Sequence, residues 1–88
     1  MKTKIHDYIE EYFPHDIDKI LLLDGYEEAF VGVVESFGFQ PKACYNYDKC
    51  IEMLMEDMSY EEAVEYFEFN IGGAYVGENT PAFVKLAL

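Results

Sequence analysis

The segment Ser59-Tyr60-Glu61-Glu62 constrains the fold more than any other part of the chain, because it is a capping box. In this motif a serine and a glutamate three residues later satisfy the free N–H groups that open a helix. The motif predicts a helix over residues 60–70, and Gly72-Gly73 is typical of a helix end. Apolar residues at helical spacing give this helix one expected inward face, formed by Tyr60, Ala63, Val64, Phe67 and Ile71.

Two further helices are predicted upstream. One covers residues 49–57 with Asp48 as its N-cap. Its expected inward residues are Ile51, Leu54, Met55 and Met58. The other covers residues 4–13 and stops at Pro14, which disfavours helical backbone in the residue before it. An apolar stripe defines its buried face: Ile5, Tyr8, Ile9, Tyr12 and Phe13.

Residues 26–37 fit two different structures. Their apolar residues match the helical template, yet Phe30-Val31-Gly32-Val33-Val34 is β-branched, aromatic and interrupted by glycine. We choose a β-hairpin with strands near residues 29–35 and 42–47, and the helical alternative for 26–37 stays open. Residues 17–23 are compatible with a buried strand or a short helical turn.

A short closing strand is predicted at Ala82-Phe83-Val84, because Pro81 suits the start of an edge strand. The expected fold is therefore a small single α+β domain covering residues 1–88. It would comprise an N-terminal helix, a β-hairpin, two consecutive acidic helices and a short C-terminal strand. Half of the residues are hydrophobic, including seven Phe and eight Tyr, which is enough material for one core.

The charge balance narrows the class of partner. Eighteen Asp and Glu face six Lys, arginine is absent, and the formal net charge is −12. Nucleic-acid affinity comes mainly from basic side chains that displace counterions, so direct nucleic-acid binding is not expected. Anionic membrane surfaces are disfavoured by the same repulsion. A basic or nucleic-acid-binding protein is the favoured partner.

Acidic residues repeat along both C-terminal helices. Asp48, Glu52 and Glu56 are spaced i, i+4, i+8, and Glu61, Glu65 and Glu68 are spaced i, i+4, i+7. Like charges at such spacing destabilise a helix by roughly 0.2–0.5 kcal/mol per pair. Because the repulsion is tolerated, we consider that these helices mimic a nucleic acid and bind a basic partner. The alternative, favoured modestly, is a solvated face that keeps a small protein in solution.

Aromatic residues exceed what the core needs. Phe30, Phe37, Phe67 and Phe83 can fill it, and the remaining rings are candidates for an interface, where Tyr and Phe are enriched. An equal alternative is that these rings wrap the edges of the core. The predicted partner-binding set therefore combines acids and rings: Glu52, Glu56, Glu61, Glu65, Glu68, Tyr45, Tyr47, Tyr66, Phe69 and Tyr75.

No residue pattern points to catalysis, a metal or a cofactor. Cys44 and Cys50 match no common zinc spacing and are interpreted as small buried apolar residues. His6, beside Asp7 and Glu10, and His15, beside Asp16 and Asp18, are interpreted as solvent-facing. The first residues do not form a signal peptide and no apolar run is long enough to span a membrane. We therefore expect a cytoplasmic protein with reduced thiols.

A series of short motifs from Asp24 onward covers about two-thirds of the chain: Asp24-Gly25, Glu28-Ala29, Gly32-Val33, Tyr47-Asp48-Lys49-Cys50-Ile51, Leu54, Met58-Ser59-Tyr60-Glu61-Glu62-Ala63, Glu65-Tyr66-Phe67-Glu68-Phe69-Asn70, Gly73-Ala74, Gly77-Glu78 and Thr80-Pro81. In these motifs the chain resembles a widespread family of small bacteriophage and prophage proteins of uncharacterised function. It departs from the family pattern by a shorter connection at Glu56-Asp57-Met58.

The resemblance implies a phage-encoded protein in a bacterial host cell, and no catalytic residue is carried over. The leading hypothesis is an accessory protein that binds a host or phage protein through the acidic, aromatic surface around residues 45–75. A sharper version makes it an inhibitor of a nucleic-acid-binding or defence protein. The alternatives are a structural homo-oligomer and, least favoured, a small thiol-dependent enzyme using Cys50 with His6 or His15.

Overall fold

A three-stranded sheet lies at the centre of the molecule, with strand order β1-β2-β3. The computed structural model describes residues 2–73 and 76–87. The α+β prediction is confirmed by the order of elements, which are α1 (Lys2–Tyr12), the 3₁₀ turn η1 (Glu27–Ala29), β1 (Phe30–Val34), β2 (Lys42–Asn46), α2 (Tyr47–Leu54), α3 (Tyr60–Phe67), the π-helix η2 (Glu68–Gly72) and β3 (Ala82–Val84).

The hairpin interpretation of residues 26–37 is confirmed, and the helical alternative is wrong beyond the single turn of η1. Strands β1 and β2 pair antiparallel, from Phe30 opposite Tyr45 to Val34 opposite Lys42, with an irregularity between Phe30 and Gly32. Gly32 has a φ of +150°, which a helix does not allow and which residues with a Cβ rarely adopt. The glycine therefore marks a bulged strand.

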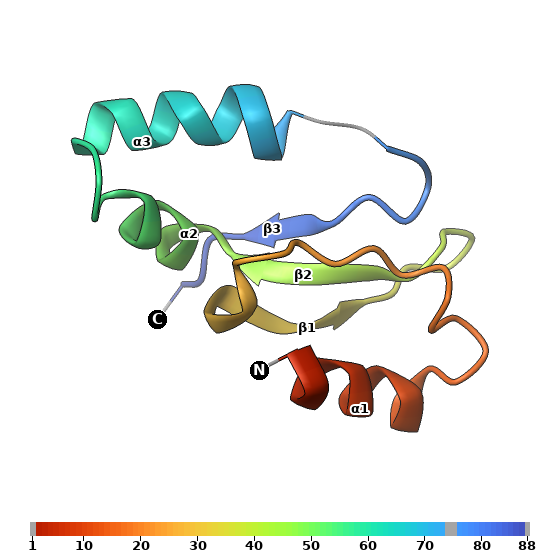
Figure 1. Ribbon diagram of the computed structural model, residues 1–88. Helices are drawn as coiled ribbons and strands as arrows, with labels where there is room; N and C mark the ends of the chain where they lie inside the picture. The colour runs from red at the N-terminus through yellow and green to blue at the C-terminus, as the bar shows by residue number, and fades with distance from the viewer. Residues whose placement is uncertain (1, 74–75, 88) are drawn as a thin grey trace.

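The predicted C-terminal edge strand is also confirmed. Strand β3 pairs parallel to β2, with Cys44 opposite Ala82 and Asn46 opposite Val84. Parallel neighbours need a long crossover connection, and here α2, α3 and η2 supply it. Figure 1 shows α3 on the β3 side of the sheet and α1 on the β1 side, with α2 beyond the end of β2.

Helix α1 begins and ends slightly earlier than predicted. Ile5 and Ile9 are buried, as the stripe implies, whereas Tyr8 and Tyr12 of the same stripe are exposed. Residues 17–23 begin as the helical turn that was one of the two alternatives, with the N–H groups of Lys19 and Ile20 donating to the Asp16 carbonyl, and they contain no strand. They comprise turns up to Lys19 and then an extended stretch without sheet pairing. This stretch is held by the N–H of Leu23, which donates to the Tyr45 hydroxyl at 2.8 Å.

The helix at Tyr47–Leu54 is capped by a different residue from the one predicted. The side chain of Asn46 accepts a hydrogen bond from the Lys49 N–H at 3.1 Å, so Asp48 lies inside the first turn. The helix also ends at Leu54 rather than 57, because residues 55–57 turn toward α3. Met55 is consequently 45% exposed, and its predicted inward position is wrong.

The capping box of α3 is confirmed in both directions. The Glu62 N–H donates to Ser59 Oγ at 3.2 Å, and the Ser59 N–H donates to Glu62 Oε1 at 3.0 Å. Ala63 and Phe67 are buried as predicted. Tyr60 is 59% exposed, so its inward assignment is wrong.

A continuous series of aromatic rings connects α1 to α3 across the whole sheet. Neighbouring ring centroids are separated by 4.7–6.2 Å, mostly in tilted or edge-to-face arrangements that aromatic pairs prefer. The series runs Tyr12, Tyr8, Phe30, Tyr45, Phe83, Phe67 and Tyr47. Phe37, predicted for the core, lies instead in the hairpin turn and is fully exposed.

Candidate functional site

A groove of about 480 Å³ combines three acidic and two aromatic side chains on the outer side of α3. Asp57 and Met58 come from the turn between α2 and α3, and the other residues come from α3 and η2. We call this the acidic groove. It is lined by Asp57, Met58, Glu62, Glu65, Tyr66, Phe69 and Asn70.

The change from α-helix to π-helix shapes one wall of this groove. Helix α3 is anchored by Ala63 and Phe67, which are both buried. From Glu68 the chain continues as η2, and this wider winding changes the direction of the side chains that follow. The side chain of Asn70 donates to the Tyr66 carbonyl at 3.1 Å. Phe69 is left 81% exposed and Tyr66 44% exposed.

The groove is electronegative. Its lining contains three carboxylates and no lysine. Hydrogen bonds from the Ser59 backbone and side chain lower the pKa of Glu62, so that carboxylate remains charged while it caps the helix. Carboxylates beside an aromatic face suit an ammonium or guanidinium group, because the ring adds cation–π attraction of about 0.5–1 kcal/mol at exposed sites. The arrangement can therefore hold a Lys or Arg side chain.

Three of the predicted partner-binding residues meet in the acidic groove, namely Glu65, Tyr66 and Phe69. Four others are exposed but do not line it: Glu52, Glu56, Glu61 and Glu68. Glu52 forms an ion pair with Lys49 at 3.0 Å. The predicted site is thus a wider acidic surface around one groove. Tyr75 lies outside the described residues.

The two tyrosines predicted upstream do not belong to the exposed surface. Tyr45 is completely buried on the central strand, so its predicted exposure is wrong. Tyr47 is half-buried, with its ring 5.2 Å from that of Phe67. The ammonium of Lys85 lies 4.6 Å from the Tyr47 centroid, on the side of the molecule where the chain ends. For these two rings, the alternative that aromatics wrap the core was the better interpretation.

Sequence reasoning missed four of the groove residues: Asp57, Met58, Glu62 and Asn70. Glu62 forms the capping box of α3 and also lines the groove. The short connection at Glu56-Asp57-Met58 was the available signal. A short turn brings the end of α2 against the start of α3, and its side chains then form one wall of the groove.

The cysteines are buried, as predicted, and free. Burial raises the pKa of Cys50 to about 11 and also raises the pKa of Cys44. A thiol with such a pKa is almost entirely protonated near neutral pH, and the thiolate is the reactive form. Burial of the Cys50 side chain and its raised pKa both disfavour its use as a nucleophile.

One cluster with metal-ligand chemistry occurs within the described part of the chain. Donor atoms of His6, Asp7 and Glu10 lie within 4.8 Å of one another on α1, and all three residues are exposed. His15 and its neighbouring aspartates form no such group among the described residues. Both histidines are exposed, as predicted.

Comparison of the chain with protein-family models, with curated proteins and with solved structures gives no match. Within residues 2–73 and 76–87, none of the helices has the length and apolar character needed to cross a membrane.

Proposed function

We propose that this protein is a binding module that recognises a basic segment of another protein through the acidic groove and the acidic surface around it. The observation that supports this most directly is the exposed pair Tyr66 and Phe69 beside Glu65. Exposed rings are costly to leave in water and are enriched in protein interfaces. Carboxylates around the rings select a cationic partner.

The acidic surface extends the groove on both helices. Glu61, Glu65 and Glu68 are exposed along α3 and η2, and Glu52 and Glu56 are exposed on α2 and the turn after it. Such a surface is complementary to proteins that bind nucleic acids, because those proteins present clustered Lys and Arg. The proposed action is inhibition of a nucleic-acid-binding or defence protein by occupying its basic surface.

The resemblance to small phage and prophage proteins supports a host protein as the target. The proposed setting is then the cytoplasm of a bacterial host cell, with the protein acting by binding rather than by catalysis. No cofactor or direct nucleic-acid contact enters this proposal, because the net charge of −12 opposes the approach of a phosphate backbone.

The test is capture of partners from a bacterial lysate with the tagged protein, at low and at high salt, read by mass spectrometry. We expect a basic nucleic-acid-binding protein at low salt and weaker capture at high salt, because exposed charges are screened. A triple reversal, Glu61→Lys with Glu65→Lys and Glu68→Lys, should abolish this capture. Glu62 is left unchanged because it caps α3.

A charge-matched control reverses three exposed glutamates elsewhere: Glu10→Lys, Glu35→Lys and Glu78→Lys. Both variants change the net charge equally, so a loss confined to the first variant identifies the acidic surface as the binding site. If wild type and both variants capture the partner equally, the acidic face does not bind it and serves only to keep the protein in solution. Equal loss in both variants would show a general charge effect.

A second candidate is a structural homo-oligomer, and the hairpin turn is the observation that favours it. Phe37 is fully exposed and Phe39 is 72% exposed, next to the edge strand β1. Two neighbouring exposed rings at the tip of a hairpin form an apolar patch of the kind found at interfaces between proteins. Light scattering behind a sizing column tests this candidate, because a strict monomer at high concentration excludes it.

A further inference from the structure

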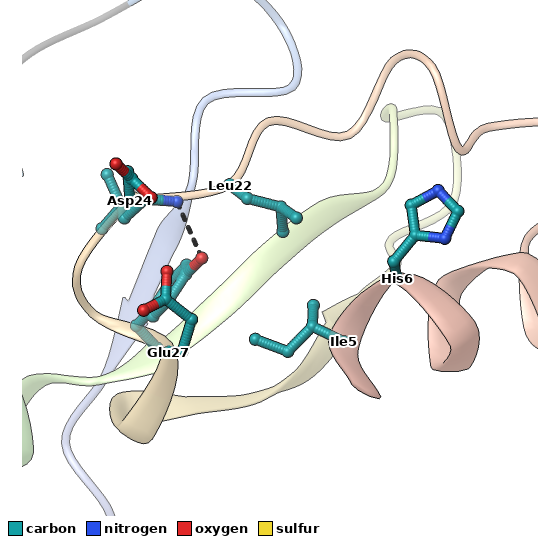
Figure 2. Close-up of a pocket in the computed structure, with 7 residues that line it drawn as sticks. Ile5, His6, Leu22, Asp24 and Glu27 are labelled. Carbon is teal, nitrogen blue, oxygen red and sulfur yellow. Dashed lines mark hydrogen bonds between the residues drawn. The ribbon is translucent and has the colours of Figure 1, made fainter. Parts of the chain in front are cut away.

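Helix α1 borders two hollows in the protein surface. The first, of about 250 Å³, lies between Ile5 and the extended segment before η1 (Figure 2). Its Glu27 carboxylate already accepts a hydrogen bond from the Gly25 N–H at 3.0 Å, and its Tyr45 hydroxyl already accepts one from the Leu23 N–H. These polar groups stabilise the fold, which leaves the second hollow as the better candidate for a binding site.

The second hollow is a groove of about 460 Å³, formed where α1 and β1 both end. Helix α1 and the turn after it supply most of its lining, and the residue that follows β1 completes it. We call it the tyrosine groove. It shares no residue with the acidic groove and is lined by Tyr8, Tyr12, Phe13, Pro14, His15, Asp16 and Glu35.

Two tyrosine rings, one helical turn apart, give the groove its apolar surface. The ring centroids of Tyr8 and Tyr12 are 5.1 Å apart and their planes are tilted by 47°. Tyr8 also contacts the ring of Phe30 edge to face at 6.0 Å, so it is supported by the sheet. Tyr12 is 62% exposed and Tyr8 36% exposed. Both rings therefore offer contact area to a ligand, and tyrosine loses little conformational entropy when it is bound.

A peptide in the polyproline II conformation suits this lining better than a strand or a helix does. An added strand needs the free backbone edge of a sheet, and no residue of β1, β2 or β3 lines the groove. A bound helix needs a hydrophobic groove, whereas this lining includes two carboxylates and a histidine. Proline-rich segments bind aromatic-lined grooves, because their polyproline II helix is already formed before binding.

The groove is also negatively charged. Asp16 and Glu35 line it, and no lysine does. Within residues 2–73 and 76–87, neither carboxylate has an ion-pair or hydrogen-bond partner. His15 is the one lining residue that can carry a positive charge, and it is exposed to solvent. A cationic side chain in the ligand would therefore be attracted by both carboxylates and by the faces of the tyrosine rings.

We propose that the tyrosine groove binds a proline-rich peptide segment that carries an arginine beside its prolines. The prolines pack against Tyr8 and Tyr12, and the arginine lies against Asp16 and Glu35. The partner is thus a protein with an extended proline-rich segment. This site does not rest on the function proposed for the acidic groove, because it uses different residues.

The test is an NMR titration of the ¹⁵N-labelled protein with three peptides, each blocked at both ends. The first has five prolines followed by arginine, the second has five alanines followed by arginine, and the third has five prolines followed by glutamate. We expect the first to shift the backbone amides of Tyr8, Tyr12 and Asp16. The alanine peptide should bind there about tenfold more weakly, because it must be ordered on binding. The glutamate peptide should not bind.

The acidic groove is read separately in the same spectra, from the amides of Tyr66 and Phe69. An arginine that enters the acidic groove does so whether prolines or alanines precede it. Shifts at Tyr66 and Phe69 should therefore be similar for the two arginine peptides. Only the amides of the tyrosine groove should distinguish proline from alanine, so the two proposals succeed or fail independently.

Two variants and two matched controls assign the contacts. Tyr12→Ala removes the more exposed ring and should weaken binding of the proline–arginine peptide about tenfold. Tyr60→Ala removes a similarly exposed tyrosine on α3, 59% exposed, and should bind as wild type does. Glu35→Gln should weaken binding about threefold, as expected for an exposed charge. Glu28→Gln changes an exposed glutamate outside the groove and should have no effect.

Three results would overturn the proposal. The alanine peptide could bind the groove as tightly as the proline peptide, Tyr12→Ala could bind as wild type does while its other amides show an intact fold, or millimolar peptide could shift none of the groove amides. A dilution series covers the remaining occupant. Groove amides that shift with protein concentration alone would assign the groove to a second copy of this chain and would also overturn the proposal.

Discussion

The hydroxyl of Tyr45 accepts a hydrogen bond from the backbone N–H of Leu23 at 2.8 Å, across 22 positions of sequence. Tyr45 lies on the central strand with no exposed surface, and its ring lies between those of Phe30 and Phe83. Leu23 belongs to the extended segment that lies outside the sheet. This contact therefore ties the extended segment before η1 to the central strand of the sheet.

Tyr45→Phe removes that contact while keeping the ring, and we expect it to destabilise the protein by about 1–3 kcal/mol. The cost arises because the part-buried N–H of Leu23 loses its acceptor. Urea unfolding followed by circular dichroism measures the change. Tyr66→Phe is the matched control, since the Tyr66 ring is partly exposed and the change should lie within about 0.5 kcal/mol of wild type. Equal stability of the two variants would contradict this role for the Tyr45 hydroxyl.

Stability should fall in alkaline solution because of Cys50. Burial raises the pKa of this thiol from its ordinary value of 9.0 to about 11, so the folded state holds the proton more tightly than the unfolded state. The contribution of this thiol to the free energy of unfolding is fully present below pH 9 and is lost as the pH rises toward 11. One pKa unit corresponds to about 1.4 kcal/mol, so the full loss approaches about 2–3 kcal/mol.

Urea unfolding at a series of pH values between 8 and 11 tests this expectation, with Cys50→Ala as the comparison. The alanine variant lacks the titrating thiol but retains Tyr45 and Cys44, whose pKa values are also raised by burial. Its stability should therefore decline less steeply with pH than that of wild type. Parallel curves for the two proteins would show that Cys50 ionises equally in both states.

Glu65→Lys should stabilise the fold slightly while it weakens partner binding. Glu65 lies one turn from both Glu61 and Glu68 on the exposed side of the helix. Glu62 is a third such neighbour, three positions before Glu65, and replacing these repulsions by attractions gains up to roughly 0.5 kcal/mol per pair. Thermal unfolding measures the gain at low salt, and it should shrink at high salt. A Glu65→Lys variant that is less stable than wild type would contradict the prediction on stability, and one that still captures the partner would contradict the prediction on binding.

The hairpin turn should matter for association and not for folding. Phe37→Ser with Phe39→Ser removes two exposed rings that cover little of the core. We expect the free energy of unfolding to change by less than about 0.5 kcal/mol for each substitution, as is usual for surface positions. If these rings join subunits, light scattering will show a smaller species for the variant than for wild type. If the wild type is monomeric and the double variant is much less stable than it, the two rings pack within the chain instead.

Local patterns in the chain determined most of the secondary structure. The capping box predicted the start of α3, because both of its hydrogen bonds join residues only three positions apart. Glycine and β-branched residues identified the hairpin, and Pro81 identified the edge strand. The N-cap of α2 was missed because Asn46 and Asp48 are both good capping residues, and only the end of β2 decides between them.

The acidic surface, too, was determined by the sequence alone, since the glutamates of α3 have no lysines at helical spacing and remain exposed. Tertiary structure decided which aromatic rings are buried and which are exposed. Tyr45 became the buried centre because strands on both sides and the segment at Leu23 cover it, while Phe37 was left in a turn that nothing covers. Burial depends on what packs across from a residue, and periodicity along one segment carries no information about that.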